Sequence, residues 1–514
     1  MKNMPQSSDF KTAPKSVTIK KTPKNRQPKK GEKMRNAGIL MPITALPSPY
    51  GIGTLGKSAF DFVDFLAESG QHYWQVLPFG PTGYGDSPYQ SFSAFASNPY
   101  LIDLDRLVEA ELITKEDIKE ANFADDEKIN YGDLYEKRFT LLKKAGRKID
   151  RNDRDFNRYI DGNAFWIHDY ALFMAIKNEN GMKPLSEWPE PLRTRDSSAL
   201  QDAAERLSDE VHFWKAVQYL FHEQWMLLRS YANSNDVKII GDLPIYISQD
   251  SAEMWCRPDL FDKDEVAGCP PDAFAPTGQL WGNPLYNWEK HREEGYHWWV
   301  KRLEHTGCFC DVVRIDHFRG FAGYYAVPAG DKTAENGRWR EGPGMHFIET
   351  IKNRVNWLPI IAEDLGFLTK DVRDLLKFSG FPGMKVMELA FSDKDSDYLP
   401  HNHIKDCVVY TGTHDNMTAV QWSEEGPEED TANAINYFGL ASKSEIPEAL
   451  IRSALSSVAD LAIIPMQDWL GLGSEGRLNT PSVSDGNWTW RMKPGSLTDD
   501  LSQKIKNLCT IYCR

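Results

Sequence analysis

The sequence contains few cysteines and lacks the short motifs that bind zinc or nucleotides. Its 514 residues include seven scattered cysteines, an odd number with no C-x-x-C pair. This pattern argues against a disulfide framework or a zinc site, so we expect reduced thiols, no metal and no cofactor. Glycine-rich nucleotide-binding motifs and the G-x-S-x-G nucleophile elbow are also absent, which argues against nucleotide-dependent and serine-esterase chemistry.

Long apolar runs and a basic surface are missing as well. No stretch of about 18 or more apolar residues occurs, so we expect no segment that spans a membrane. The formal net charge is −14. Nucleic acid and anionic membranes are recognised by basic surfaces, so we expect neither as a partner.

The positive charge that is present lies at the N-terminus. Residues 1–35 contain eleven Lys and Arg against two acidic residues, a net charge of +9, which leaves −23 for the rest. Residues 1–34 are rich in Lys, Pro, Ser and Thr, and we expect a disordered tail. No apolar segment follows as in a secretory signal. A solvated extension, an alternative start at Met34 and a Lys-rich transit peptide stay open, so we predict a cytoplasmic protein, with a plastid as the alternative.

Eight short apolar runs end in polar or glycine-rich turns and are interpreted as buried parallel strands. They span residues 37–43, 72–79, 237–247, 311–318, 359–366, 383–391, 406–415 and 461–468. Helical patterns separate several of them. The alternation predicts an α/β fold, a (β/α)8 TIM barrel over residues 35–514, although alternation alone does not exclude a doubly wound sheet.

Two long segments interrupt this alternation. Residues of about 104–235, after the second run, have amphipathic helical patterns and are predicted to form a helical insertion subdomain. Residues of about 251–305 are rich in Pro, Gly and Trp. Connections of this length are commonly lids or binding loops, so we expect a lid there.

Polar residues gather at the carboxyl ends of the apolar runs, where β/α barrels carry their active sites. They are Asp242, Arg314, Asp316, Glu363, Asp364, His414 and Asp415. A single acidic residue in such a position commonly caps the next helix. Four strand ends of this kind favour a catalytic site instead.

The neighbours of these carboxylates suggest their chemistry. Arg314 and Asp316 point to the same face of a strand, and a guanidinium favours an ionised carboxylate, as a nucleophile requires. Glu363 follows three apolar residues, and burial would raise its pKa, as a general acid requires. Two such carboxylates fit glycoside cleavage with retention, and Asp415 would be a third that binds sugar hydroxyls.

Two segments combine aromatic and polar side chains in a way that suits a sugar, whose rings have apolar faces and hydroxyl rims. Residues 83–100 interleave Tyr and Phe with Asp, Ser, Gln and Asn, and residues 274–288 interleave Phe, Trp and Tyr with Gln and Asn. The alternative is that these aromatic rings pack inward as ordinary core.

Several long motifs together resemble the amylomaltases, the 4-α-glucanotransferases of glycoside hydrolase family 77. They are GPTGYGDSPYQSFSAFASNPYLIDL, GDLPIYISQDSAEMW, PPDAFAPTGQLWGNPLYNW, VVRIDHFRGF, IIAEDLG, GFPGMKV and YTGTHDN. The resemblance covers about residues 37–494. It implies a (β/α)8 barrel and transfer of α-1,4-glucan segments through a covalent intermediate to glucose or another glucan.

The resemblance also implies roles for single residues. Asp316 matches the nucleophile, Glu363 the acid/base and Asp415 the transition-state stabiliser. The matched sugar-binding residues are Arg314, His317, His414, Asp242, Tyr89, Ser87, Gln279 and Trp281, with Tyr84 at a second glucan site in some members. Maltooligosaccharides, glycogen or starch are the implied partners, and the oligomeric state stays open between monomer and dimer.

This chain departs from the family pattern in the lid. Some members have an aromatic pair after Pro-Pro-Asp, where this chain has Ala273-Phe274, so we expect the acceptor-side contacts, with Phe274 as a candidate, to differ from theirs while the chemistry stays the same. The alternatives to a transferase are an α-1,4-glucan hydrolase and an inactive glucan-binding protein. Presence of all three carboxylates argues against an inactive protein.

Overall fold

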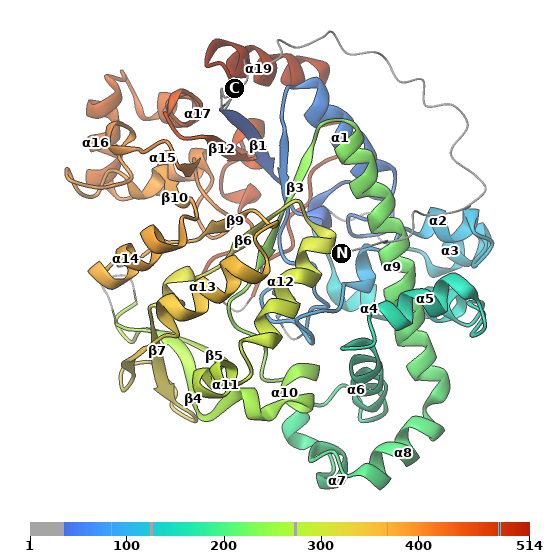
Figure 1. The fold of residues 1–514 in the computed structure, drawn as a ribbon. Helices are drawn as coiled ribbons and strands as arrows, with labels where there is room; N and C mark the ends of the chain where they lie inside the picture. Colours follow the sequence, from blue (N-terminus) through green and yellow to red (C-terminus); the bar gives the residue numbers. More distant parts are fainter. Residues whose placement is uncertain are drawn as a thin grey trace. The chain divides into compact units, whose positions relative to one another are not determined.

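The computed structural model describes residues 35–514 except 84, 124–126, 272–274, 367, 482 and 484. The predicted basic tail, residues 1–34, lies outside the described residues. Figure 1 shows strands gathered at the centre, with helices such as α1 (Lys57–Glu68), α12 (His297–Phe309) and α13 (Gly344–Arg354) around them.

The central sheet has eight parallel strands in the order β10-β11-β12-β1-β2-β3-β6-β9. Their bounds are β1 Asn36–Leu40, β2 Tyr73–Gln75, β3 Lys238–Leu243, β6 Val312–Ile315, β9 Ile360–Ala362, β10 Gly383–Val386, β11 Cys407–Tyr410 and β12 Leu461–Pro465. The amide of Ala362 donates to Pro382 O at 2.9 Å, which joins β9 to the residue before β10. The predicted (β/α)8 barrel is confirmed, and each of the eight apolar runs overlaps one strand.

Burial on both faces explains why these strands are almost wholly apolar. Every residue of β6, β9, β11 and β12 is buried. The helices cover the outer face of the barrel, each with one apolar side. In α1, for example, Phe62, Val63 and Leu66 are buried. Lys57, Asp61 and Asp64 of the same helix are exposed. Burying one such large side chain stabilises the fold by about 1.5–3 kcal/mol.

The segment between β2 and β3 is helical. It contains α2 Leu104–Glu109, α3 Lys115–Ala121, α4 Tyr131–Gly146, α5 Arg154–Gly162, α6 Ile167–Glu179, α7 Glu190–Arg193, α8 Ser197–Arg206 and α9 Ser208–Ser234. The long helix α9 runs from this segment back to the barrel (Figure 1), where Trp225 Nε1 donates to Phe309 O at 3.0 Å.

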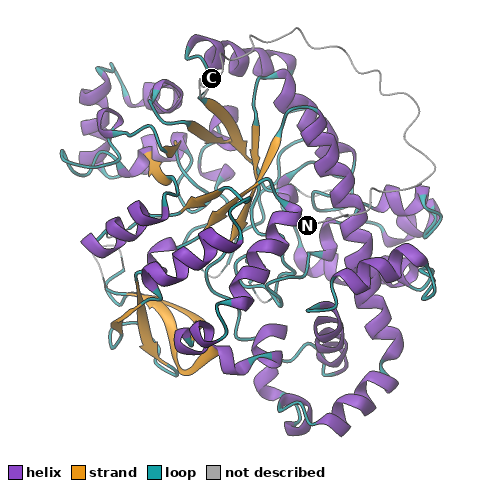
Figure 2. Cartoon of the chain, viewed as in Figure 1, coloured by secondary structure: helices purple, strands orange, loops and turns teal. Residues whose placement is uncertain are grey.

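A second sheet, with four antiparallel strands, was not expected from the sequence. Its order is β5-β4-β7-β8, with β4 Phe261–Cys269, β5 Gln279–Tyr286, β7 Gly323–Pro328 and β8 Arg338–Glu341. It is the separate group of orange strands in Figure 2. Charged and glycine residues within β4 and β8 break the apolar alternation that would have identified them.

The remaining helices follow the later strands. They are α10 Ala252–Cys256, α11 Trp288–Glu293, α14 Lys370–Ser379, α15 Ala419–Glu425, α16 Glu428–Phe438, α17 Ile446–Ser456, α18 Met466–Leu470 and α19 Asp499–Ile511. Across the described part of the chain, none of the helices is both long and apolar enough to cross a membrane.

Candidate active site

The barrel topology brings the strand-end residues to one rim. Asp242 in β3 lies in register with Arg314 in the adjacent β6, and Ile315 of β6 is in register with Ala362 of β9. Asp316 and Glu363 are the next residues along these two strands. Neighbouring strands lie about 4.8 Å apart, so the two carboxylates leave the sheet side by side.

Arg314 is the centre of an ionic network. Its Nη1 donates to both carboxylate oxygens of Asp242 at 2.7 Å, and its Nη2 lies 3.2 Å from Asp316 Oδ1. The Nε donates to the sulfur of Met384 at 3.3 Å. Each nitrogen of the guanidinium therefore has a partner, and Arg314 and Asp242 are held rigidly.

Tyr89 and His414 form one wall of the site. The Tyr89 hydroxyl donates to Asp242 Oδ2 at 2.7 Å, and the Tyr89 ring stacks on the His414 ring at 5.0 Å and 17°. Trp488 packs against both rings at 5.9 Å. The aromatic residues of this wall are thus fixed by stacking and by a hydrogen bond to a carboxylate.

Asp415 is held in its ionised form. His414 Nε2 lies 3.1 Å from Asp415 Oδ2, and Asn479 Nδ2 donates to Asp415 Oδ1 at 2.6 Å. Burial would raise the pKa of Asp415, but His414 and Asn479 lower it to about 2. The carboxylate is therefore charged at any pH near neutrality.

Glu363 accepts hydrogen bonds from two backbone amides. The amide of His317 donates to Oε2 at 2.6 Å and that of Leu365 to Oε1 at 2.7 Å. His317 has a φ of 50°, in the left-handed region, and this conformation places its amide toward Glu363. Strained backbone of this kind is common where a side chain must be held for function.

The acidities of Asp316 and Glu363 are shifted apart. Burial and the nearby Asp316 together raise the pKa of Glu363 to about 8, although Arg314 and the two backbone amides oppose this. Burial also raises the pKa of Asp316, which Arg314 lowers only in part, so that it lies at about 6. Arg314 does favour the ionised form of Asp316, as its sequence position predicts, but burial has the larger effect, and Asp316 remains the stronger acid of the two.

The second sheet supplies a further wall. Trp281 on β5 packs edge-on against the His317 ring at 4.9 Å, and its Nε1 donates to Gln279 Oε1 at 3.1 Å. Burial lowers the pKa of His317 to about 3, so its imidazole is neutral. Gln279 and Trp281, which the family resemblance matched to sugar-binding positions, are thus brought together with His317, the residue after Asp316.

Of the remaining expected site residues, Ser87 lies in the loop that carries Tyr89. Its Oγ accepts from the Tyr89 amide at 3.3 Å. Tyr84 and Phe274 lie outside the described residues.

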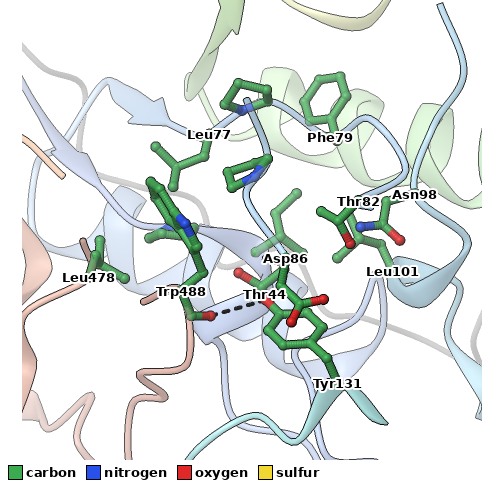
Figure 3. Close-up of a pocket in the computed structure, with 14 residues that line it drawn as sticks. Thr44, Leu77, Phe79, Thr82, Asp86, Asn98, Leu101, Tyr131, Leu478 and Trp488 are labelled. Carbon is green, nitrogen blue, oxygen red and sulfur yellow. Dashed lines mark hydrogen bonds between the residues drawn. The ribbon is translucent and has the colours of Figure 1, made fainter. Parts of the chain in front are cut away.

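A small cavity of about 30 Å³ lies behind this loop (Figure 3). Asp86, Thr82 and Trp488 line it, and the Tyr131 hydroxyl donates to Trp488 O at 3.0 Å. Burial raises the pKa of Asp86 to about 6. None of the three strand-end carboxylates Asp316, Glu363 and Asp415 lines this cavity, so it lies next to their site, with Trp488 contributing to both.

Asn479, Trp488 and Met384 contact the site but were not identified from the sequence. Asn479 and Trp488 follow the last strand by many residues, in a segment without regular structure. Met384 lies within β10 and resembles any buried apolar residue of a strand. Their positions became visible only through the contacts with Asp415, Tyr89 and Arg314.

Comparisons with known proteins identify the family to which the chain belongs. Residues 41–498 match the family model of glycoside hydrolase family 77, described as 4-alpha-glucanotransferase. The 4-alpha-glucanotransferase of Clostridium butyricum is 46% identical over 485 residues, which cover 92% of this chain and 100% of that protein. The chloroplastic/amyloplastic 4-alpha-glucanotransferase of Solanum tuberosum is 42% identical and covers 92% of this chain and 85% of its own length.

The chain is also similar in fold to a solved structure. The amylomaltase from Streptococcus agalactiae in complex with acarbose superposes with a TM-score of 0.90 at 41% identity, covering 93% of this chain and 99% of that one. The chain belongs to the 4-alpha-glucanotransferase family, glycoside hydrolase family 77. It is an enzyme that transfers segments of α-1,4-glucan.

Proposed function

We propose that the transfer proceeds by double displacement with retention, with Asp316 as nucleophile, Glu363 as acid/base and Asp415 as transition-state stabiliser. The observation that carries this proposal is the different environment of two adjacent carboxylates. Asp316, with a pKa of about 6, is largely ionised at neutral pH, whereas Glu363, with a pKa of about 8, is largely protonated. Retaining enzymes need two carboxyl groups close together, one ionised as the nucleophile and one protonated as the acid.

In the first step Asp316 attacks the anomeric carbon of the donor glucan. The glycosidic bond breaks, Glu363 transfers its proton to the leaving oxygen, and a glycosyl ester forms on Asp316. In the second step Glu363, now a carboxylate, takes the proton from the 4-hydroxyl of an acceptor. That oxygen attacks the anomeric carbon and releases Asp316 unchanged.

Asp415 acts through charge and hydrogen bonding to the sugar. It stays ionised throughout, held by His414 and Asn479, and a fixed anion next to an oxocarbenium-like transition state lowers the barrier. Because its partners are already in place, no reorganisation is needed when charge develops.

The remaining residues bind the glucan in this proposal. Asp242, Arg314, Tyr89, Ser87 and His414 line the donor side, and His317, Gln279, Trp281 and Phe274 the acceptor side, with Tyr84 at a second glucan site. Flat aromatic surfaces next to amides and carboxylates suit sugar rings, which have apolar faces and polar rims.

We infer that maltooligosaccharides and glycogen or starch are the donors, and that glucose or another glucan is the acceptor. Residues of about 251–305 form the lid that keeps water from the intermediate, and residues of about 104–235 form a separate helical insertion. Nucleic acid and membranes are not proposed as partners. The strongly acidic enzyme is assigned to the cytoplasm, with the plastid as the alternative.

A trapping experiment tests the mechanism. In Glu363→Gln, a maltosyl fluoride donor still glycosylates the nucleophile because fluoride leaves without acid help, but the second step lacks its base. Peptide mass spectrometry of the quenched protein should find the sugar on Asp316. Sugar on Asp242 or Asp415 would overturn the assignment. Incubation of the native enzyme with maltotriose should give glucose and longer oligosaccharides, whereas glucose and maltose alone would indicate a hydrolase.

A further inference from the structure

The loop that carries His414 and Asp415 joins β11 to α15 and is tied at both ends to one buried carboxylate. Thr411 Oγ1, at the start of the loop, donates to Asp468 Oδ2 at 2.5 Å. The amide of Ala419, just past the end of the loop, donates to Asp468 Oδ1 at 2.8 Å. Asp468 lies in α18, directly after β12, the strand that pairs with β11.

A second buried acid supports the same loop from its other side. Glu388 follows β10, which also pairs with β11, and its amide donates to Thr411 O at 3.2 Å. Its Oε1 lies against Gly412, where an added Cβ would come within 2.4 Å. The loop is therefore held by acids from both neighbouring strands.

The two acids differ in how burial and charge affect them. Asp468 accepts two hydrogen bonds and donates none, as an ionised carboxylate does, and its pKa, raised by burial, is about 6. Burial and the charge of Asp468 raise the pKa of Glu388 well above its usual value, although Arg477 and the backbone of Met417 oppose this. Asp468 is therefore largely charged near neutral pH, and burial disfavours a second charge on Glu388 beside it.

The ties at Asp468 lead directly to Asp415. The loop between Thr411 and Ala419 is short, and within it Asn416 Oδ1 accepts from the amide and the hydroxyl of Thr413 at 3.0 and 2.8 Å. The amide of Asp415 donates to the Thr413 hydroxyl at 3.3 Å. A loop braced internally in this way transmits a change at its ends to the carboxylate that it carries.

We propose that Asp468 is a positioning residue for the transfer reaction, which sets the place of Asp415 by holding both ends of its loop. This inference rests on the role proposed above for Asp415. A displacement of about 1 Å in a catalytic group lowers the rate strongly, even when the altered residue lies away from the substrate. Loss of the tie should therefore lower kcat more than it changes KM, because Asp415 acts mainly in the transition state.

Asp468→Asn is the informative variant. The amide keeps the size of the side chain but replaces one acceptor oxygen with an NH2 donor. The Asn side chain therefore cannot accept the hydrogen bonds of both Thr411 and Ala419. We expect kcat for maltotriose to fall about 10–100-fold, with KM within about twofold. Thr411→Val, which removes the hydroxyl, should reproduce part of this loss in kcat. Thr411→Ser, which keeps the hydroxyl, should retain most of the native kcat.

Asp103 offers a matched control. It is as buried as Asp468, 4% exposed in both cases, and likewise accepts from a threonine hydroxyl, Thr54 Oγ1 at 2.6 Å, and from a helix amide, Arg106 N at 3.1 Å. It lies outside the catalytic loop. Asp103→Asn should lower the melting temperature about as much as Asp468→Asn does, but it should leave kcat per folded enzyme unchanged.

A double-mutant cycle decides between positioning and general damage. If Asp468 acts through Asp415, Asp468→Asn should reduce kcat less than about threefold when Asp415 is already Asn. An equal loss of kcat in both backgrounds, or an equal loss in Asp103→Asn, would overturn the inference. An Asp415→Asn variant with native kcat would contradict the role proposed for Asp415 itself, and with it this inference.

Discussion

Arg314 Nη1 contacts both carboxylate oxygens of Asp242 at 2.7 Å, whereas Nη2 reaches a single oxygen of Asp316 at 3.2 Å. Asp242 also accepts from the Tyr89 hydroxyl at 2.7 Å, so protein donors occupy most of its acceptor positions. Asp316 keeps more of its acceptor capacity for a substrate. This difference supports Asp316 rather than Asp242 as the nucleophile, a choice that the sequence alone made only by resemblance.

Charge substitutions in this network should shift the acidic limb of the pH profile in opposite directions. Arg314 lowers the pKa of Asp316 and Asp242 raises it. We expect Arg314→Gln to move the acidic limb of kcat/KM to higher pH and Asp242→Asn to move it to lower pH. Both variants should lose about 100-fold or more in kcat/KM for maltotriose, because each disrupts a preorganised charge network. Shifts of the same sign would show that another group controls this limb.

The native enzyme should have a bell-shaped pH profile. Activity needs Asp316 ionised, above a pKa of about 6, and Glu363 protonated, below a pKa of about 8. Initial rates with maltotriose across this range should define both limbs. With a glycosyl fluoride donor the first step needs no acid, so the basic limb of that step should disappear. A basic limb that persists with the fluoride would argue against Glu363 as the acid.

Burial of Glu363 should reduce the stability of the fold above acidic pH. Its pKa is about 8 when folded and near its ordinary, lower value when unfolded, so the unfolded chain ionises first and stability is lost as pH rises between these values. Glu363→Gln removes this loss. We expect its melting temperature to exceed that of the native enzyme by about 1–3 °C at pH 8 and to match it at pH 4.

The matched control for this experiment is Glu424→Gln, since the Glu424 side chain is exposed at the end of α15. Calorimetry at the two pH values should show no pH-dependent gain for that variant. If Glu363→Gln gains nothing at pH 8, the proposed burial of a neutral Glu363 is wrong.

The barrel could be predicted because its strands are buried on both faces and are therefore almost wholly apolar. Several contacts of the site, however, come from segments that have no such regular pattern. Asp316 and Glu363 each follow an apolar run, and parallel strands bring such positions to one rim. Trp281 lies on a strand of a sheet whose alternation is broken by glycine and charged residues. Asn479 meets Asp415 through an irregular segment 64 residues later in the chain. No local pattern encodes such a contact.

The acidity of Asp316 shows a second limit of the same reasoning. The sequence places Arg314 two residues from Asp316 on the same face, and the guanidinium does lower the pKa of that carboxyl. How deeply Asp316 is buried depends on the walls supplied by other strands and loops. Burial proved the larger effect, and only the assembled structure contains it.

Tyr89 contributes both a hydroxyl and a ring, and two substitutions separate these contributions. Tyr89→Phe removes the hydrogen bond to Asp242 and keeps the stack on His414 at 5.0 Å. A hydrogen bond to a charged group is worth about 1.5–3 kcal/mol, so we expect a loss of about 10–100-fold in kcat/KM for maltotriose. Tyr89→Ala also removes the stack that supports His414, and through it Asp415, so its loss should be larger and include a lower kcat. Equal losses in the two variants would mean that the ring contributes nothing beyond its hydroxyl group.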